Sequence, residues 1–266
     1  METKYFDLKN KRALISGGAA GIGSSIVEHL CEQGAEVYFF DIDKKEAKKT
    51  INKIKKKNFK IPIFVNCNVK NIKKYKSSIL KIIKKNGPID ILVNNAGTSS
   101  AAPFDETPDE TWDYDIDLKL YGAIRCSRLA IDQMKKQSYG RIINITTPGG
   151  KAPTASSVPT SVSRAAGIAL TKAMSKDFAK HNILVNTVGV GLIRSGQHRK
   201  RWEVKADSNP NLSLDDFYQE MGSGVPMGRV GDANEVGAVI AFLASEKASY
   251  ITGASINVDG GTSPVV

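Results

Sequence analysis

The chain has 266 residues, of which 41% are apolar and 24% charged, with a formal net charge of +11. This composition supplies a full hydrophobic core and excludes an intrinsically disordered chain. No run of about 18 apolar residues occurs, so we predict no membrane partner. The first residues lack the apolar stretch of a signal peptide, and the three cysteines are scattered singly. We therefore expect a cytoplasmic protein with reduced thiols and no metal site.

The positive charge is concentrated between residues 44 and 85, which contain 16 lysines and one acid. One interpretation is a nucleic-acid surface. However, these lysines alternate with Ile and Asn at helical spacing, without arginine and with little aromatic interleaving. The pattern favours two solvated helices, and we predict no nucleic-acid partner.

Apolar runs of strand length alternate with amphipathic stretches of helical length along the whole chain. Such alternation, with nearly continuous apolar strands, indicates a parallel sheet covered by helices on both faces. We therefore predict an α/β fold, in which residues 1–266 form a single doubly wound domain. The expected elements are strand 12–16, helix 22–33, strand 37–41, helix 43–57, strand 61–66, helix 71–86, strand 89–93, helix 112–136, strand 141–146, helix 161–180, strand 183–188, helix 232–244 and strand 255–258.

Residues 196–224 interrupt this alternation with a basic stretch, an acidic patch and several glycines. Insertions of this kind lie over the carboxyl edge of the sheet, where ligands bind in such folds. We therefore predict a substrate lid. Its basic residues Arg199, Lys200 and Arg201 would suit an anionic or thioester-linked substrate, although exposed basic clusters more often contact only water.

A glycine-rich segment, Ser16-Gly-Gly-Ala-Ala-Gly-Ile-Gly23, follows the first strand and opens the first helix. Glycines let the backbone approach a pyrophosphate, and the helix N-terminus offers amide donors and a favourable dipole. Asp41 closes the second strand, where a carboxylate accepts hydrogen bonds from an adenosine ribose and repels a 2′-phosphate. The pattern predicts NAD as the cofactor and disfavours NADP; the alternative role of Asp41 is a helix N-cap.

Further motifs accompany this loop: Asn94-Asn-Ala-Gly97 and the segments 112–122, 140–147, 184–195 and 250–261. In order and spacing, over essentially the whole chain, they resemble the short-chain dehydrogenase/reductase family. The resemblance implies a Rossmann-type sheet of about seven parallel strands, a small-molecule substrate, and a homotetramer or homodimer. The cofactor-binding residues that the motifs and the resemblance suggest are Gly17, Ala20, Gly21, Ile22, Gly23, Asp41, Ile42, Asn68, Val69, Asn95, Ala96, Gly97, Arg164, Ile193 and Ser195.

The catalytic positions depart from the family pattern of an Asn on the long helix, a Ser after the fifth strand, and Tyr-x-x-x-Lys on the next helix. Those positions hold Lys119, Thr147, Thr160 and Arg164, and residues 140–217 contain no tyrosine. Thr147 keeps a hydroxyl that can hydrogen-bond a substrate oxygen. Thr160 is a poor acid without a base, and Arg164 stays charged, so neither replaces the phenol as a proton donor.

Lys119 has two interpretations. If it points inward near Arg164, two cations share one site and its pKa falls toward a useful acid/base range. If it pairs with Asp115 or Asp117, it does nothing chemical.

The favoured prediction is an NAD-dependent oxidoreductase with a non-standard active site, acting on a carbonyl/alcohol pair or a conjugated enoyl substrate. The alternative is a catalytically silent NAD-binding protein, a sensor or a partner subunit.

Overall fold

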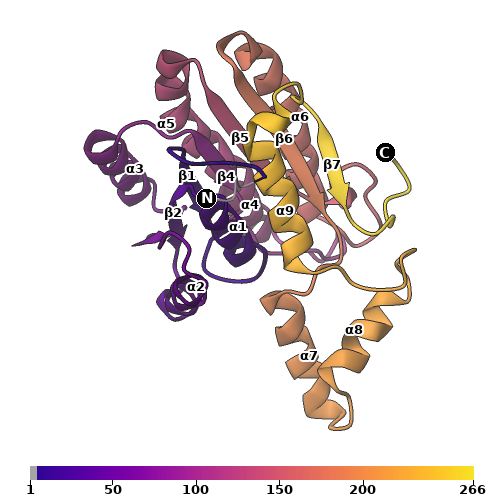
Figure 1. Cartoon of the computed structure of the whole chain (residues 1–266). Coiled ribbons are helices and arrows are strands. Elements are labelled where there is room, and N and C mark those ends of the chain that lie inside the picture. The colour runs from indigo at the N-terminus through magenta and orange to yellow at the C-terminus, as the bar shows by residue number, and fades with distance from the viewer. Residues whose placement is uncertain (1–4) are drawn as a thin grey trace.

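Seven short apolar segments lie side by side in one parallel sheet, in the order β3-β2-β1-β4-β5-β6-β7 (Figure 1). The computed structural model describes residues 5–266. In the register of the sheet, Ile15 lies opposite both Phe39 and Val93. The predicted α/β sheet of seven parallel strands is confirmed, with strands β1 (Arg12–Ser16), β2 (Glu36–Asp41), β3 (Ile63–Asn66), β4 (Ile91–Asn94), β5 (Gly140–Thr146), β6 (Ile183–Val190) and β7 (Ser255–Val258).

Helices cover both faces of this sheet. Those whose apolar side chains share a core with α1 are α2 and α9, whereas α3, α5 and α6 pack on the opposite face. The helices are α1 (Gly21–Glu32), α2 (Lys44–Lys56), α3 (Ile72–Asn86), α4 (Asp109–Ile116), α5 (Gly122–Gln137), α6 (Thr160–Phe178), α7 (Gly196–Ser208), α8 (Leu214–Gly222) and α9 (Ala233–Ala244), with short turns η1 (Asp117–Tyr121), η2 (Pro148–Gly150), η3 (Ala179–His181) and η4 (Glu246–Ala248).

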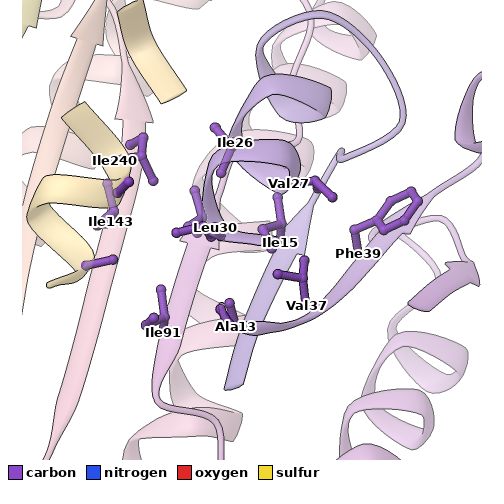
Figure 2. Packing of buried hydrophobic residues seen from close by; sticks show 14 of the residues in the cluster. Ala13, Ile15, Ile26, Val27, Leu30, Val37, Phe39, Ile91, Ile143 and Ile240 are labelled. Carbon is purple, nitrogen blue, oxygen red and sulfur yellow. The ribbon is translucent and has the colours of Figure 1, made fainter. Parts of the chain in front are cut away.

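Strand alternation divides the core into two layers. Ala13 and Ile15 of β1 face α1, where Ile26 and Leu30 pack against them (Figure 2). Leu14, between them in sequence, faces the opposite cluster. Each of these side chains is at most 1% exposed, and burial of such a side chain stabilises the fold by about 1.5–3 kcal/mol. The sheet is therefore a rigid platform whose carboxyl edge carries the loops of the site.

The predicted long helix 112–136 begins earlier, at Asp109, and is interrupted by one π-helical turn, η1. A π turn holds one residue more than an α turn, so it changes the direction of the side chains within it. Lys119 lies in this turn. Sequence periodicity missed the interruption because the apolar pattern continues on both sides of it.

Residues 196–224, the predicted lid, contain two helices that the sequence did not indicate. Figure 1 shows α7 and α8 as a hairpin that projects beyond the sheet, past the end of β6. Phe217, Tyr218 and Val230 form a small buried cluster of their own here, and Trp202 packs against it. Between residues 5 and 266, no helix is long and apolar enough to cross a membrane.

The lysine-rich stretch forms α2 and α3, as expected, and both helices are amphipathic. α2 buries Ala47, Thr50 and Ile54, while most of its lysines are exposed. Lys53 of this helix and Lys57, its C-cap residue, extend to the buried carboxylate of Glu28 on α1, at 2.6 and 2.5 Å. At least part of the lysine-rich surface therefore pairs within the protein.

Candidate active site

The glycine-rich turn between β1 and α1 has room for backbone only. Gly17 has a positive φ of 71°, which favours glycine. A Cβ added at Gly23 would lie 1.8 Å from the carbonyl oxygen of Gly17, and one added at Gly17 would lie 2.9 Å from the Cα of Ala96. The turn therefore forms a cradle at the N-terminus of α1, the arrangement that binds a pyrophosphate through backbone amides.

Asn95 and Asp41 fix this turn from two sides. The Asn95 side chain donates to the carbonyl oxygens of Gly17 and Ser16, at 2.7 and 3.2 Å. One carboxylate oxygen of Asp41 accepts from the amide of Ala19 at 2.9 Å. The other accepts from the amides of Ile42 and Asp43. Asp41 thus holds the β2 end against the glycine-rich turn, and its N-cap alternative is excluded because Asp43 caps α2.

The remaining predicted cofactor residues lie around the same edge. Ser195 caps α7, and its Cβ would be 3.8 Å from a Cβ added at Gly21. Ile193 is buried and pairs with Gly231 in an isolated bridge. Val69 is buried, whereas Asn68 and Ile42 are exposed. The chain therefore brings the glycine-rich turn, the β4 end and the β6 end to the same edge of the sheet, which is the candidate cofactor cleft.

Lys119 points inward from the π turn and is 6% exposed. Its ammonium group forms an ion pair with the carboxylate of Asp115, one turn earlier and fully buried. It also donates to the hydroxyl of Thr160 at 3.0 Å. A Cβ added at Gly97 would lie 3.4 Å from Lys119 Cγ and 2.8 Å from Nη2 of Arg164, so both cations border the same glycine. Both sequence interpretations of Lys119 therefore hold geometrically, because it faces Arg164 and also pairs with Asp115.

The Thr160 hydroxyl lies at the centre of this network. It accepts from Lys119 Nζ and from the amide of Ser100, at 3.0 and 2.9 Å, and it donates to Asp115 at 3.3 Å. A hydroxyl offers one proton and two lone pairs, so all of its hydrogen-bonding capacity is used. The second oxygen of Asp115 accepts from Ser163 at 2.6 Å. In this arrangement the Thr160 hydroxyl holds Lys119 and has no donor or acceptor left for a ligand.

Burial and the charge of Arg164 together change the protonation of Lys119. Burial, followed by repulsion from Arg164, lowers the pKa of Lys119 to about 8, against the opposing effect of Asp115. Burial also lowers the pKa of Arg164 to about 10. Arg164 donates to the carbonyl oxygen of Ile145 at 2.6 Å, while its Nε has no partner among residues 5–266. The site thus holds two buried cations and one buried carboxylate, which favours a further anionic or electron-rich group.

Lys119 lines two small cavities of about 20 and 10 Å³. The larger one, between Lys119 and Arg164, has room for about one water molecule.

Thr147 occupies the N-cap position of the turn η2 after β5, and its hydroxyl forms no hydrogen bond within the part of the chain that the structure describes. It is the candidate catalytic hydroxyl left available to a ligand.

His198 and the lid arginines contribute less. His198 is half-buried on α7, and burial followed by the charge of Arg201 lowers its pKa. Arg199 and Lys200 are exposed, and Arg199 pairs with Glu203 on its own helix at 3.7 Å. No group of three or more His, Cys, Asp or Glu residues between positions 5 and 266 could hold a metal ion.

The sequence indicated Lys119, Thr160 and Arg164 as candidate catalytic positions, and the structure places them next to one another. The sequence did not predict the contacts of Ser163 and Ser100. Ser163 follows Thr160 by one helical turn, so the helical period could have placed it on the same side. Ser100 contributes a backbone amide from an irregular loop, for which the sequence carries no signal. The sequence indicated Asp115 only as one of two alternative partners of Lys119, and the structure shows that Asp115 is fully buried.

A parallel sheet with a glycine-rich turn at the N-terminus of its first helix, and an acid closing its second strand, defines a Rossmann-type nucleotide-binding protein. The family model described as enoyl-(acyl carrier protein) reductase matches residues 17–263. The chain belongs to the short-chain dehydrogenase/reductase family. It is an oxidoreductase of that family, whose members use nicotinamide cofactors.

Relatives and solved structures agree with this assignment. A 3-oxoacyl-(acyl-carrier-protein) reductase of Staphylococcus epidermidis is 33% identical over 255 residues, 95% of this chain and 98% of that protein. The aldohexose dehydrogenase of Thermoplasma acidophilum superimposes with a TM-score of 0.86 at 32% identity, covering 99% of both chains. The L-sorbose reductase of Gluconobacter frateurii, complexed with NADPH and L-sorbose, gives a TM-score of 0.92 at 26% identity over 99% of this chain and all of that one.

Proposed function

We propose that the protein transfers hydride between NAD(H) and a carbonyl/alcohol or conjugated enoyl substrate through a non-standard active site. One observation carries the proposal: Lys119 is buried beside Arg164 and contacts the threonine at the position of the family tyrosine. A lysine with a pKa of about 8 exchanges protons in the range where a general acid is effective.

The cofactor half of the cleft fits a dinucleotide. The turn at Gly17 and Gly23 leaves no space for side chains, which suits a backbone cradle around a pyrophosphate. When bound, the nicotinamide supplies the hydride. Asp41 favours NAD because a carboxylate near the ribose repels a 2′-phosphate. The similarity to a reductase complexed with NADPH favours NADP(H) instead. Both cofactors are therefore included in the test.

In this proposal three residues of the chain bind the substrate oxygen, supply its proton and stabilise its charge. Thr147 presents a free hydroxyl to the substrate oxygen. Lys119 Nζ holds the proton that the reduced oxygen receives, and Arg164 adds positive charge that stabilises a developing oxyanion or enolate. An enoyl substrate would need less from the missing phenol, because hydride adds to its β-carbon and the two cations stabilise the enolate oxygen. The α-carbon then takes its proton from water.

The lid and the oligomer complete the proposal. The α7–α8 hairpin would close over the substrate, and its exposed basic residues would suit an anionic or thioester-linked molecule. Three exposed apolar side chains support assembly into a homodimer or homotetramer. They are Tyr114, Tyr121 and Val162, on α4, η1 and α6.

A second candidate is a catalytically silent NAD-binding protein. The observation that favours it is the saturated hydroxyl of Thr160, which faces Asp115, Lys119 and Ser100 rather than a ligand. In this alternative the ion pair only fills the position that a catalytic residue occupies in relatives.

A substrate screen separates the two candidates. Purified protein with NADH, NAD, NADPH and NADP is tested on ketones, alcohols and enoyl thioesters, with calorimetry of cofactor binding alongside. We expect turnover with NADH, and Lys119→Met should lower kcat by about 100-fold or more because a general acid contributes that much. Lys136→Met, at an exposed lysine of α5, is the control and should not change kcat. Tight cofactor binding without turnover on any substrate would support the silent candidate.

A further inference from the structure

Asp115 is the only acid that the ionisable groups of this site contact among residues 5–266. It lies on α4, is 0% exposed, and both of its oxygens are used. One oxygen binds the Lys119 ammonium group and the Thr160 hydroxyl, and the other accepts from Ser163. A buried carboxylate with this many donors is held in one position, because each rotation would leave a donor unsatisfied.

This arrangement fixes the direction of the Lys119 ammonium group. Two of its three N–H bonds are directed, one to Asp115 and one to Thr160. Thr160 is itself anchored by the Ser100 amide. Because an ammonium group is tetrahedral, the two fixed bonds determine the direction of the third. Lys119 lines both small cavities of the site, and the polar side chain of Asn94 lines both of them as well.

The same contact sets the charge of Lys119. The groups that face it are Asp115 on α4, Thr160 and Arg164 on α6, and the neutral amides of Asn94 and Asn144 around the larger cavity. Burial and Arg164 both favour the neutral amine, and Asp115 alone among these groups opposes them. Without the carboxylate, Lys119 would lose its proton at a lower pH and would no longer be an acid near neutrality.

We infer that Asp115 is the positioning residue of the site: it holds Lys119 protonated and, together with Thr160, directs its ammonium group toward the substrate. The inference rests on the proposed function, because it presumes that Lys119 donates the proton. It accounts for the buried acid on α4 and for the saturated hydroxyl of Thr160, which becomes part of the support of Lys119.

The test uses Asp115→Asn in the full-length protein and has two readouts. The first is the titration of Lys119, followed by NMR of the Cε and Nζ signals in protein labelled with ¹³C,¹⁵N-lysine and assigned with Lys119→Met. We expect its pKa to fall by about one unit or more, since a neighbouring opposite charge is removed. Asp113→Asn, two residues earlier and exposed, should leave it unchanged. An unchanged Lys119 pKa in Asp115→Asn would overturn the inference even if no substrate were found.

The second readout is the pH dependence of kcat with NADH and the substrate identified by the screen. In Asp115→Asn, the pH above which kcat falls should move to lower values, and kcat near neutral pH should fall about tenfold. A lower kcat with an unmoved pH profile would indicate a merely structural role and would overturn the inference.

A conservative variant covers the case in which Asp115→Asn does not fold. Asp115→Glu keeps the charge but moves the carboxylate, so we expect a Lys119 pKa close to that of the parent together with a lower kcat. Cofactor binding by calorimetry checks that the cleft is intact. A Lys119 pKa in Asp115→Glu that falls, or a kcat that stays at the parent value, would contradict the inference. Absent turnover in every protein would disprove the proposed function, while the NMR titration would still decide the role of Asp115.

Discussion

At the residue scale, single glycines allow the close packing of the turn in the proposed cofactor cleft. Gly23 is the clearest case, because an added Cβ would lie 1.8 Å from the Gly17 carbonyl oxygen and 2.8 Å from the Asn95 side chain. Neither neighbour can retreat easily, since the two are hydrogen-bonded to each other at 2.7 Å. The spacing of the glycine-rich segment predicted a role for Gly17 and Gly23 in cofactor binding. The structure gives a physical reason why both are glycines, because neither position has room for a side chain.

Gly23→Ala should therefore distort the turn and weaken cofactor binding without unfolding the protein. We expect the Kd for NADH, measured by calorimetry, to rise about tenfold or more, equivalent to about 1.4 kcal/mol. Gly224→Ala is the matched control, because an added Cβ there meets no atom within 4 Å. Equal cofactor affinity in the two variants would show that the turn does not form the cradle.

The candidate catalytic residues were only partly predictable at this scale. Motif spacing identified Lys119, Thr160 and Arg164, and the i,i+4 spacing made Asp115 a possible partner of Lys119. It could not reveal that Asp115 is fully buried, because an Asp in an acidic, amphipathic stretch is expected at the surface. Three-dimensional packing against α6 determined the difference.

At the element scale, the ends of helices position the loops of the site. α9 begins after Asp232, whose carboxylate accepts from the amide of Asn234 at 2.8 Å, while Glu235 accepts from the Asp232 amide at 2.7 Å. This capping box fixes the start of a helix that packs on α1. The segment just before it, at Gly231, pairs with Ile193 in the cofactor cleft. The cap therefore links the stability of the α9 N-terminus to the position of Ile193 in the proposed cofactor cleft.

Asp232→Ala should lower the free energy of unfolding by about 1 kcal/mol, the usual cost of losing an N-cap. Urea denaturation at neutral pH measures it. Asp177→Ala, at an exposed position within α6, should change that free energy by less than about 0.5 kcal/mol. A loss no larger than that of the control would mean that the cap contributes nothing measurable.

The pH dependence of the cap follows from Glu235. A hydrogen bond from Arg229, followed by the Asp232 amide, lowers the pKa of Glu235 from 4.5 to about 2. Because the folded-state pKa is the lower one, the stabilisation is fully present above pH 4.5 and is lost as the pH falls toward 2. Screening by solvent reduces its size, since Glu235 is exposed.

Helix periodicity predicted most elements but not η1, α7 or α8. The π turn leaves the apolar pattern intact on both sides, so periodicity reads one continuous helix. The lid helix α7 was not predicted for another reason. α7 buries none of its side chains, and so it lacks the amphipathic stripe by which a surface helix is recognised.

At the scale of the whole molecule, the order of the seven strands and of the helices between them was readable from the sequence, except for the short turns and the lid helices α7 and α8. The central strands β4, β5 and β6 are buried on both faces, and such continuous apolar runs are the strongest local signal that a chain carries. The charge distribution belongs to this scale as well. The positive excess lies on α2 and α3, apart from the catalytic positions, so it does not explain the two buried cations of the site.

The central claim is that a nicotinamide cleft has been kept while the proton donor has become a lysine held by a buried aspartate. The pH profile of kcat/KM for substrate reduction, in the parent and in Lys119→Arg, tests it most directly. Protonated Lys119 is the acid, so the parent should lose activity as the pH rises through about 8. This loss should vanish in Lys119→Arg, because a guanidinium stays charged. A parent profile that stays flat through that pH, or the same loss in Lys119→Arg, would contradict the account.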